Sequence, residues 1–111
     1  MAKGPIHFSK VAEAALEHFA TLLRVQRKER NWKLEELADR LGVSIPTVRK
    51  MLEGSPRVAI GTYFEAAHLL GVSLFDPDQK RFALMAAKTA GIDALLPQRV
   101  RTRDEDIDDD F

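Results

Sequence analysis

The chain has 111 residues, with 17 Lys and Arg against 17 Asp and Glu, so its formal net charge at pH 7 is zero. A chain of this length supports a single hydrophobic core, and its 45% hydrophobic and 31% charged residues are ordinary for a globular protein. The absence of cysteine excludes disulfide scaffolds, thiolate metal sites and cysteine nucleophiles.

The first predicted element is a long helix from Ser9 to Arg30. Apolar residues recur in this segment at helical spacing, and neither Gly nor Pro interrupts them. Asn31 tolerates the left-handed conformation found at helix ends, so we expect the helix to stop there. The apolar positions are Ala12, Ala15, Leu16, Phe19 and Leu23.

The second predicted helix covers the segment LEELADRL, residues 34–41. Its apolar residues share one face, and Gly42 follows as a stop signal. That glycine opens the tight link GVS, which permits the sharp turn of a helix-turn-helix. The apolar face consists of Leu34, Leu37, Ala38 and Leu41.

The third predicted helix begins after Ser44, which is a favourable N-cap residue. Pro46 falls in its first turn, where a missing amide hydrogen costs nothing. Gly54 and Pro56 are expected to end this helix.

The fourth predicted helix begins near Thr62, because Thr62 and Glu65 form a capping-box pattern, and it ends at Gly71. Its apolar residues include Phe64, Ala67, Leu69 and Leu70.

Asp76, Pro77 and Gln79 repeat the start signal for a fifth helix, which we expect to stop near Gly91. No segment alternates with the period of two that is typical of strands. The sequence therefore predicts an all-α, five-helix domain over residues 9–96, followed by a flexible, basic-then-acidic tail over residues 97–111.

The third helix carries the main functional signal. On a helical wheel Val48, Met51 and Leu52 cluster on one side and are expected to face the core. The opposite side holds Pro46, Arg49, Lys50 and Glu53, with Ile45 at the border.

An apolar tip on a basic face fits a helix that enters a DNA major groove. There Ile45 and Pro46 can touch thymine methyl groups, while Arg49 and Lys50 can donate to guanine O6 and N7. A plain surface helix with solvated cations remains the alternative. The candidates for contacts to the DNA backbone are Lys33, Ser44, Thr47 and Arg57.

The charges are unevenly distributed. Residues 24–57 hold nine basic side chains against five acidic ones, whereas residues 98–111 hold three arginines against six carboxylates. The basic middle indicates a polyanion partner, and the acidic end indicates a segment that competes for that surface or binds a second partner. Plain solvated charge explains the acidic end equally well.

Residues 23–72 resemble the Cro/C1-type (XRE) helix-turn-helix family, a five-helix DNA-binding domain of phage repressors and many bacterial antitoxins. The segments GSPRVAIGTY and LPQRVR and the terminal DDDF are similar to the HipB-like antitoxins encoded beside HipA-type kinase toxins. The residues that match the helix-turn-helix family are Leu23, Arg27, Leu37, Ala38, Leu41, Gly42, Val43, Ser44, Thr47, Val48, Met51, Gly54, Leu69, Leu70 and Gly71.

The resemblance implies that Ile45, Pro46, Arg49 and Lys50 lie where the family reads bases. It also implies that Ser44, Thr47 and Arg57 lie where the family grips phosphates. Lys33, Leu34 and Leu52 depart from the family pattern: Lys33 replaces the usual Ser or Thr cap, so the second helix is expected to grip DNA differently.

Two classes of function follow. The first is a cytoplasmic transcriptional repressor that binds a palindromic operator as a homodimer, either as an autoregulating antitoxin or as a free-standing repressor. The second is an interaction protein that mainly sequesters a partner, for which the resemblance implies a kinase toxin. The candidates for the dimer or partner surface are Phe82, Met85, Ile92, Leu95 and the tail residue Phe111, although packing within the domain explains the helical ones equally well.

Catalysis is not expected. His7, His18 and His68 form no metal-binding motif, and the adjacent Glu35 and Glu36 point in different directions on a helix. We therefore expect no enzyme, no cofactor and no metal. No run approaches the roughly 20 apolar residues of a membrane span, and the start of the chain lacks the apolar run of a signal peptide.

Overall fold

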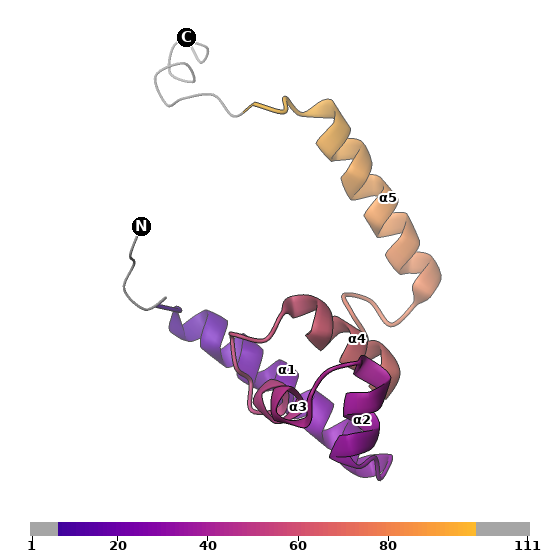
Figure 1. Cartoon of the computed structure of the whole chain (residues 1–111). Coiled ribbons are helices and arrows are strands. Elements are labelled where there is room, and N and C mark those ends of the chain that lie inside the picture. Colours follow the sequence, from indigo (N-terminus) through magenta and orange to yellow (C-terminus); the bar gives the residue numbers. More distant parts are fainter. Residues whose placement is uncertain (1–6, 100–111) are drawn as a thin grey trace. The chain divides into compact units, whose positions relative to one another are not determined.

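The computed structural model describes residues 7–99, which contain five α-helices and no strand (Figure 1). The predicted all-α, five-helix architecture is confirmed. The chain divides into two compact units, of which the first ends at Leu74 and the second begins at Phe75. Helices α1 to α4 belong to the first unit and α5 to the second, so the domain expected over residues 9–96 spans both.

Helix α1 covers Lys10–Glu29. Ser9 caps it by accepting a hydrogen bond from the Ala12 amide at 3.1 Å. Asn31 follows in the left-handed conformation, with φ of 57°, as its position in the sequence predicted. Leu23 is buried, whereas Ala12 and Ala15 are exposed, so the core-facing part of α1 begins about one turn later than the apolar pattern indicates.

Helix α2 covers Leu34–Leu41, as predicted. Helix α3 covers Ile45–Leu52: it begins after Ser44, as predicted, and ends shortly before the predicted stop at Gly54. Ser44 caps α3 by accepting from the Thr47 amide at 3.2 Å. Lys33 stands at the N-cap of α2 and makes no side-chain capping bond.

Helix α4 covers Ile60–Leu70 and begins earlier than the sequence predicted. The N-cap residue is Ala59, and the Thr62 amide already donates to the Ala59 carbonyl at 3.0 Å. Thr62 is therefore part of the first turn, and the predicted capping box with Glu65 is wrong. Gly71 ends the helix with φ of 75°, as predicted.

Helix α5 covers Gln79–Leu95, and both of its predicted ends need correction. Asp78, and not Asp76, is the N-cap residue: its carboxylate accepts from the amides of Lys80 and Arg81 at 2.9 and 3.2 Å. The helix also continues through Gly91. It ends where Pro97 forces the preceding Leu96 into an extended conformation, with ψ of 150°.

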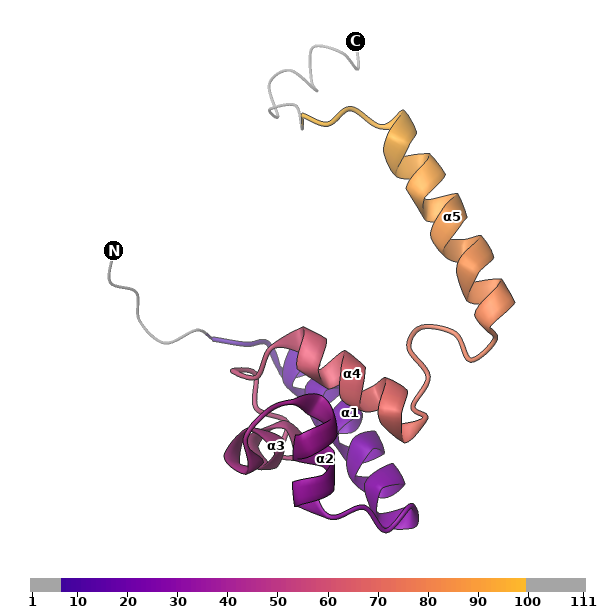
Figure 2. The ribbon, with the colours of Figure 1, turned by 45° about the vertical axis from the view of Figure 1, so that its right-hand side comes forward.

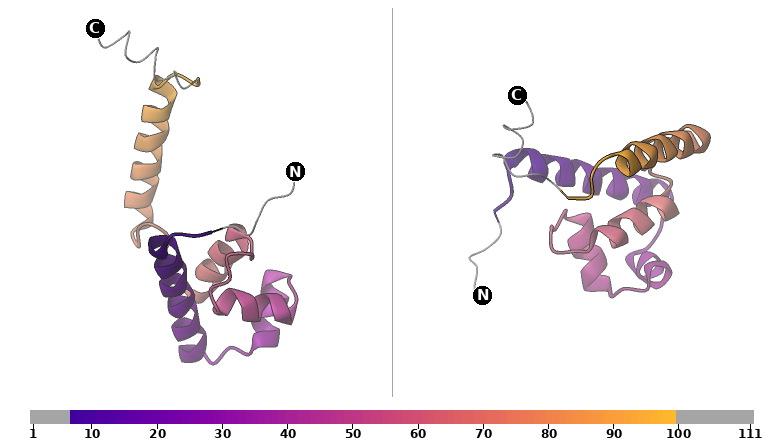
Figure 3. Two further views of the ribbon diagram at one scale, coloured as in Figure 1. Left: turned by 90° about the vertical axis from the view of Figure 1, so that its left-hand side faces the viewer. Right: turned by 90° about the horizontal axis from the view of Figure 1, so that it is seen from above.

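The hydrophobic core of the first unit draws on all four of its helices. Figures 2 and 3 show α2, α3 and α4 gathered along the same side of α1. The largest fully buried side chains are Leu23, Leu37, Val48, Met51 and Leu70. Over residues 7–99, no helix combines the length and apolar character needed to cross a bilayer.

Candidate nucleic-acid interface

A tight turn joins α2 to α3. Gly42 adopts φ of 71°, and its amide donates to the Ala38 carbonyl at 2.8 Å. The Val43 amide donates to the same carbonyl at 3.1 Å. A side chain at Gly42 would be strained in this conformation, so the glycine fixes the short connection between the two helices.

The buried side of α3 sets its rotation about its own axis. Val48 and Met51 are fully buried and Leu52 nearly so, as the helical wheel predicted. These side chains pack in the same cluster as Leu23 of α1 and Leu37 of α2. Turning α3 would expose this apolar surface to water, so its outer face is held in one orientation.

The outer face of α3 carries the predicted base-reading residues. Pro46, Arg49 and Lys50 are exposed, and Glu53 is exposed beside them at the end of the helix. Ile45 is half-buried and packs against the core, which agrees with its predicted position at the border. The fold therefore presents two cations and a proline ring outward.

The predicted phosphate contacts fall into three places. Ser44 and Thr47 lie together at the start of α3, where their hydroxyl oxygens are 2.9 Å apart. Lys33 is exposed just before α2, and Arg57 is exposed between α3 and α4. The structure thus brings Ser44 and Thr47 together and leaves Lys33 and Arg57 as separate surface cations.

Two side chains hold the C-terminal end of α3 and the segment that follows it, and sequence reasoning missed both roles. Arg24 Nη1 on α1 donates to the Leu52 carbonyl at 2.6 Å. The Tyr63 hydroxyl on α4 donates to the Ser55 carbonyl at 2.6 Å. Burial raises the pKa of Tyr63 to about 12, so its hydroxyl remains a donor across the physiological range.

A close approach of backbone to α1 completes this attachment. Gly54 has φ of 82°, and a Cβ built there would lie 3.6 Å from the Ala20 Cβ and 3.3 Å from Glu17 Oε1. The sequence signalled a helix stop at Gly54, but nothing local signalled its contact with a helix more than thirty residues earlier.

Arg40 has a partner within the fold. Its guanidinium carbon lies 4.5 Å from the centroid of the Trp32 ring, a cation–π contact, and it also pairs with Glu36 at 3.5 Å. Arg27 supports the same loop by donating to the Trp32 carbonyl at 2.8 Å. The start of α2 is therefore held by the stacking of Arg40 on Trp32 and by the hydrogen bond from the Arg27 side chain to the Trp32 carbonyl, in place of a side-chain cap.

The candidate dimer residues on α5 are accessible. No residue of α5 is buried, and Met85 and Leu95 are 49% and 87% exposed. Phe82 and Ile92 are also exposed, and the Phe82 ring lies 6.2 Å from that of Phe75. The predicted tail residue Phe111 lies outside the described residues.

No group of three or more His, Asp or Glu side chains within residues 7–99 is placed to hold a metal ion.

Comparison with known proteins identifies the part of the chain that carries this geometry. Residues 23–76 match the family model described as "Helix-turn-helix". No curated protein and no solved structure matches the chain. The matched segment contains α2, the turn, α3 and α4, together with the end of α1 that packs against them. Residues 23–76, just under half of the chain, therefore match a helix-turn-helix domain, and their helices are consistent with the Cro/C1 type, which supports a DNA-binding transcription regulator.

Proposed function

We propose that the chain is a sequence-specific transcriptional repressor that binds a palindromic operator as a homodimer. One observation carries this proposal: the buried side of α3 fixes the helix so that Arg49 and Lys50 point outward beside Pro46. A helix held in this way can enter a major groove, and two symmetric copies would occupy successive grooves.

The exposed residues suit distinct parts of such a complex. Arg49 can donate two hydrogen bonds to guanine O6 and N7, while Ile45 and Pro46 offer apolar surface to thymine methyl groups. Ser44 and Thr47, with the amides at the start of α3, suit phosphate oxygens. Lys33 and Arg57 add cations that contribute affinity at any sequence.

The homodimer rests on the apolar residues of α5. Phe82, Met85 and Ile92 are exposed in one chain, and so is Leu95 at the end of the helix. Burying these side chains between two copies would remove apolar surface from water and is therefore favourable. Analytical ultracentrifugation over a series of protein concentrations gives the concentration at which half of the chains are dimeric. This concentration should rise when Met85 and Ile92 are both replaced by Lys, because the dimer is weakened.

The test of DNA reading starts from operator sequences selected out of a random duplex library by the full-length protein. Arg49→Ala should weaken operator binding by about 1–3 kcal/mol and relax the preference at one base pair. Lys33→Ala should weaken all duplexes alike and make binding less sensitive to salt.

Lys80→Ala, which removes an exposed cation from α5, is the matched control and should bind the operator as the unchanged protein does. Unchanged operator affinity in both Arg49→Ala and Lys50→Ala would overturn the groove assignment.

We further propose that the repressor is the autoregulating antitoxin of a HipA-type kinase toxin. The support is the similarity of the segments 54–63, 96–101 and 108–111 to such antitoxins. Within residues 54–63 the structure exposes Pro56, Arg57 and Ile60, which leaves this segment open to a partner.

A capture experiment with a co-expressed HipA-type kinase tests this role by comparing the full chain with one ending at Pro97. Loss of capture in the shorter chain would support a partner-binding tail. Undiminished capture would overturn the role of the tail, and absence of capture by either chain would leave a free-standing repressor. Capture combined with indifference to all DNA would favour a module that only sequesters its partner.

A further inference from the structure

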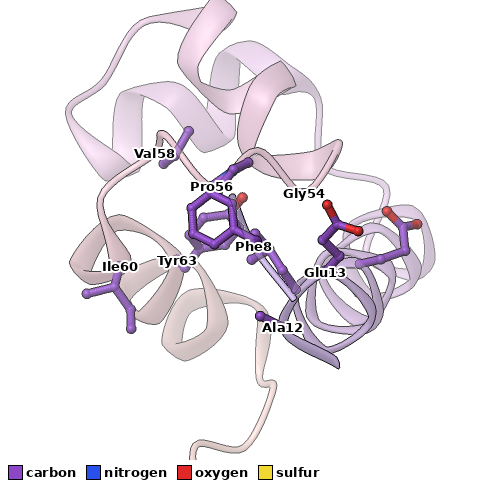
Figure 4. Close-up of a pocket in the computed structure, with 10 residues that line it drawn as sticks. Phe8, Ala12, Glu13, Gly54, Pro56, Val58, Ile60 and Tyr63 are labelled. Carbon is purple, nitrogen blue, oxygen red and sulfur yellow. The ribbon is translucent and has the colours of Figure 1, made fainter. Parts of the chain in front are cut away.

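A concave apolar pocket lies in the first unit, between the N-terminal half of α1 and the segment that joins α3 to α4 (Figure 4). Its volume of about 530 Å³ falls within the usual range for small-molecule sites. Phe8 and Ala12 line it from one side, and Val58 and Ile60 from the other. The proposed DNA contacts do not use these four residues.

The lining is apolar and open to solvent. Phe8 is 43% exposed and Ile60 is 69% exposed, so the free protein presents this surface to water. The hydroxyl of Tyr63 lies among the lining residues but is already committed to the Ser55 carbonyl. An occupant would therefore gain mainly from apolar burial on this side of the pocket.

The α1 wall of the pocket is acidic. Glu13 and Glu17 both line it, and their spacing of four residues places two like charges side by side on one helix. Glu17 pairs with Arg24 at 3.2 Å, whereas within residues 7–99 Glu13 makes no side-chain hydrogen bond or ion pair. Among the described residues one negative charge at the wall is thus uncompensated, and a cation there would also relieve the repulsion.

We propose that this pocket binds a small amphipathic cation, with its ammonium group against Glu13 and Glu17 and its hydrocarbon part against Phe8, Val58 and Ile60. The charge selects a cation over a neutral or anionic molecule of the same length. The apolar lining selects an alkyl or aryl amine over a bare ammonium ion.

The pocket wall is continuous with the contacts that hold α3. Glu17 pairs with Arg24, and Arg24 in turn donates to the Leu52 carbonyl in the last turn of α3. An ammonium group that competes for Glu17 withdraws one partner of Arg24 and loosens this attachment. Ligand binding should therefore weaken operator binding, and operator should weaken ligand binding by the same factor. This consequence rests on the proposed DNA-binding function, whereas the ligand site does not.

The binding test uses the full-length protein without DNA and three probes of equal chain length: octylammonium, octanol and octanoate. Calorimetric titration should show octylammonium binding about tenfold more tightly than octanol, the effect of one ionic contact near a protein surface, with octanoate weakest. Equal affinity for the three probes, or no binding of octylammonium, would overturn the proposal.

Two variants locate the site. Glu13→Gln should reduce octylammonium binding to the level of octanol, whereas Glu29→Gln, which removes an exposed carboxylate from the far end of the same helix, should leave it unchanged. Ala12→Trp should fill the pocket and abolish binding. Ala12 is exposed, so an unchanged melting temperature should verify that this variant folds.

Other occupants give different results. If a second copy of the chain fills the pocket, Ala12→Trp will lower the sedimentation coefficient of the free protein and octylammonium will not bind, which overturns the proposal.

The regulatory consequence has its own readout. Saturating octylammonium should weaken operator binding of the unchanged protein and leave that of Ala12→Trp unaltered. An operator affinity that is insensitive to a bound amine would overturn the link to α3. Failure to bind any operator would instead overturn the proposed function, and the amine titration would still stand.

Discussion

Helices α3 and α5 show two opposite ways in which this chain treats apolar residues. Helix α3 is only eight residues long, yet it buries Val48, Met51 and Leu52. Helix α5 is 17 residues long and buries none. A short helix is marginal by itself, so α3 owes its order to packing. Helix α5 is longer, and Asp78 caps its start. The comparison indicates that α3 is built to hold a fixed orientation and α5 to present apolar surface.

Paired methionine substitutions test whether α3 contributes to the core and α5 does not. Met51→Ala in α3 should lower the free energy of unfolding by about 2–5 kcal/mol, because it leaves a cavity in a fully buried site. Met85→Ala in α5 should change it by about 0.5 kcal/mol or less. Urea unfolding at a low concentration of monomer provides the measurement. If both variants lost the same free energy of unfolding, the conclusion that α3 belongs to the core and α5 does not would be contradicted.

Paired glycine substitutions sharpen the comparison between the two regions. Gly54→Ala should destabilise the protein by about 1–2 kcal/mol, because φ of 82° is unfavourable for alanine and the new methyl group meets α1. Gly91→Ala should stabilise α5 by about 0.5–1 kcal/mol, since Gly91 is helical and faces open space. Thermal unfolding of both variants checks the opposite signs. A stabilising Gly54→Ala would rule out the close approach described for the end of α3.

The Tyr63 hydroxyl, which lies in the first unit, makes the stability of the fold depend on pH. Its pKa is raised from 10.0 to about 12 in the folded state, so the folded protein binds this proton more tightly than the unfolded chain does. The resulting stabilisation should be complete below about pH 10 and should be lost as the pH rises from about 10 to about 12. Ultraviolet titration should follow this one group directly, because the chain contains a single tyrosine.

Tyr63→Phe should remove the pH-dependent loss of stability and should cost about 1–3 kcal/mol at neutral pH, because it leaves the Ser55 carbonyl without its donor. A tyrosine that ionises near pH 10 in the folded protein would contradict the burial of this side chain.

The smallest expected effect concerns the start of the second unit. The Arg81 guanidinium, followed by the Asp78 amide, holds the pKa of Asp76 below its usual value. The interaction therefore stabilises the fold at pH values above the usual pKa of an aspartate. This stabilisation is lost as the pH falls through the lowered pKa of Asp76. Arg81→Ala should raise the pKa of Asp76, as measured from carboxyl chemical shifts, whereas Lys80→Ala should leave it low. An unchanged pKa in Arg81→Ala would disprove the ion pair.

The predictions from sequence succeeded where neighbouring residues decide the conformation. Asn31, Gly42 and Gly71 end helices in the left-handed conformation, and Ser44 caps α3, all as expected from local chemistry. The starts of α4 and α5 were misplaced, because Thr62 and Asp76 carry the right residue types but other residues make the capping contacts. The end of α5 was misplaced because Gly91 weakens a helix without stopping it, whereas Pro97 restricts Leu96 outright.

The candidate DNA-facing surface followed from the spacing of residues in α3 alone. The groups that fasten α3 did not, because they come from distant parts of the chain. Arg24 lies on α1 and Tyr63 on α4, and only the folded chain brings them to the carbonyls of Leu52 and Ser55. The same is true of the pocket that contains Glu13, whose two walls come from separate segments of the sequence.

The contact between Arg40 and Trp32 offers a built-in optical signal. Trp32 is the sole indole in the chain, so its emission reports one location, the beginning of α2. If Arg40 swings toward a phosphate when a duplex arrives, the ring loses its neighbouring cation and the emission changes. Unlabelled protein can then serve as its own fluorescent sensor of docking.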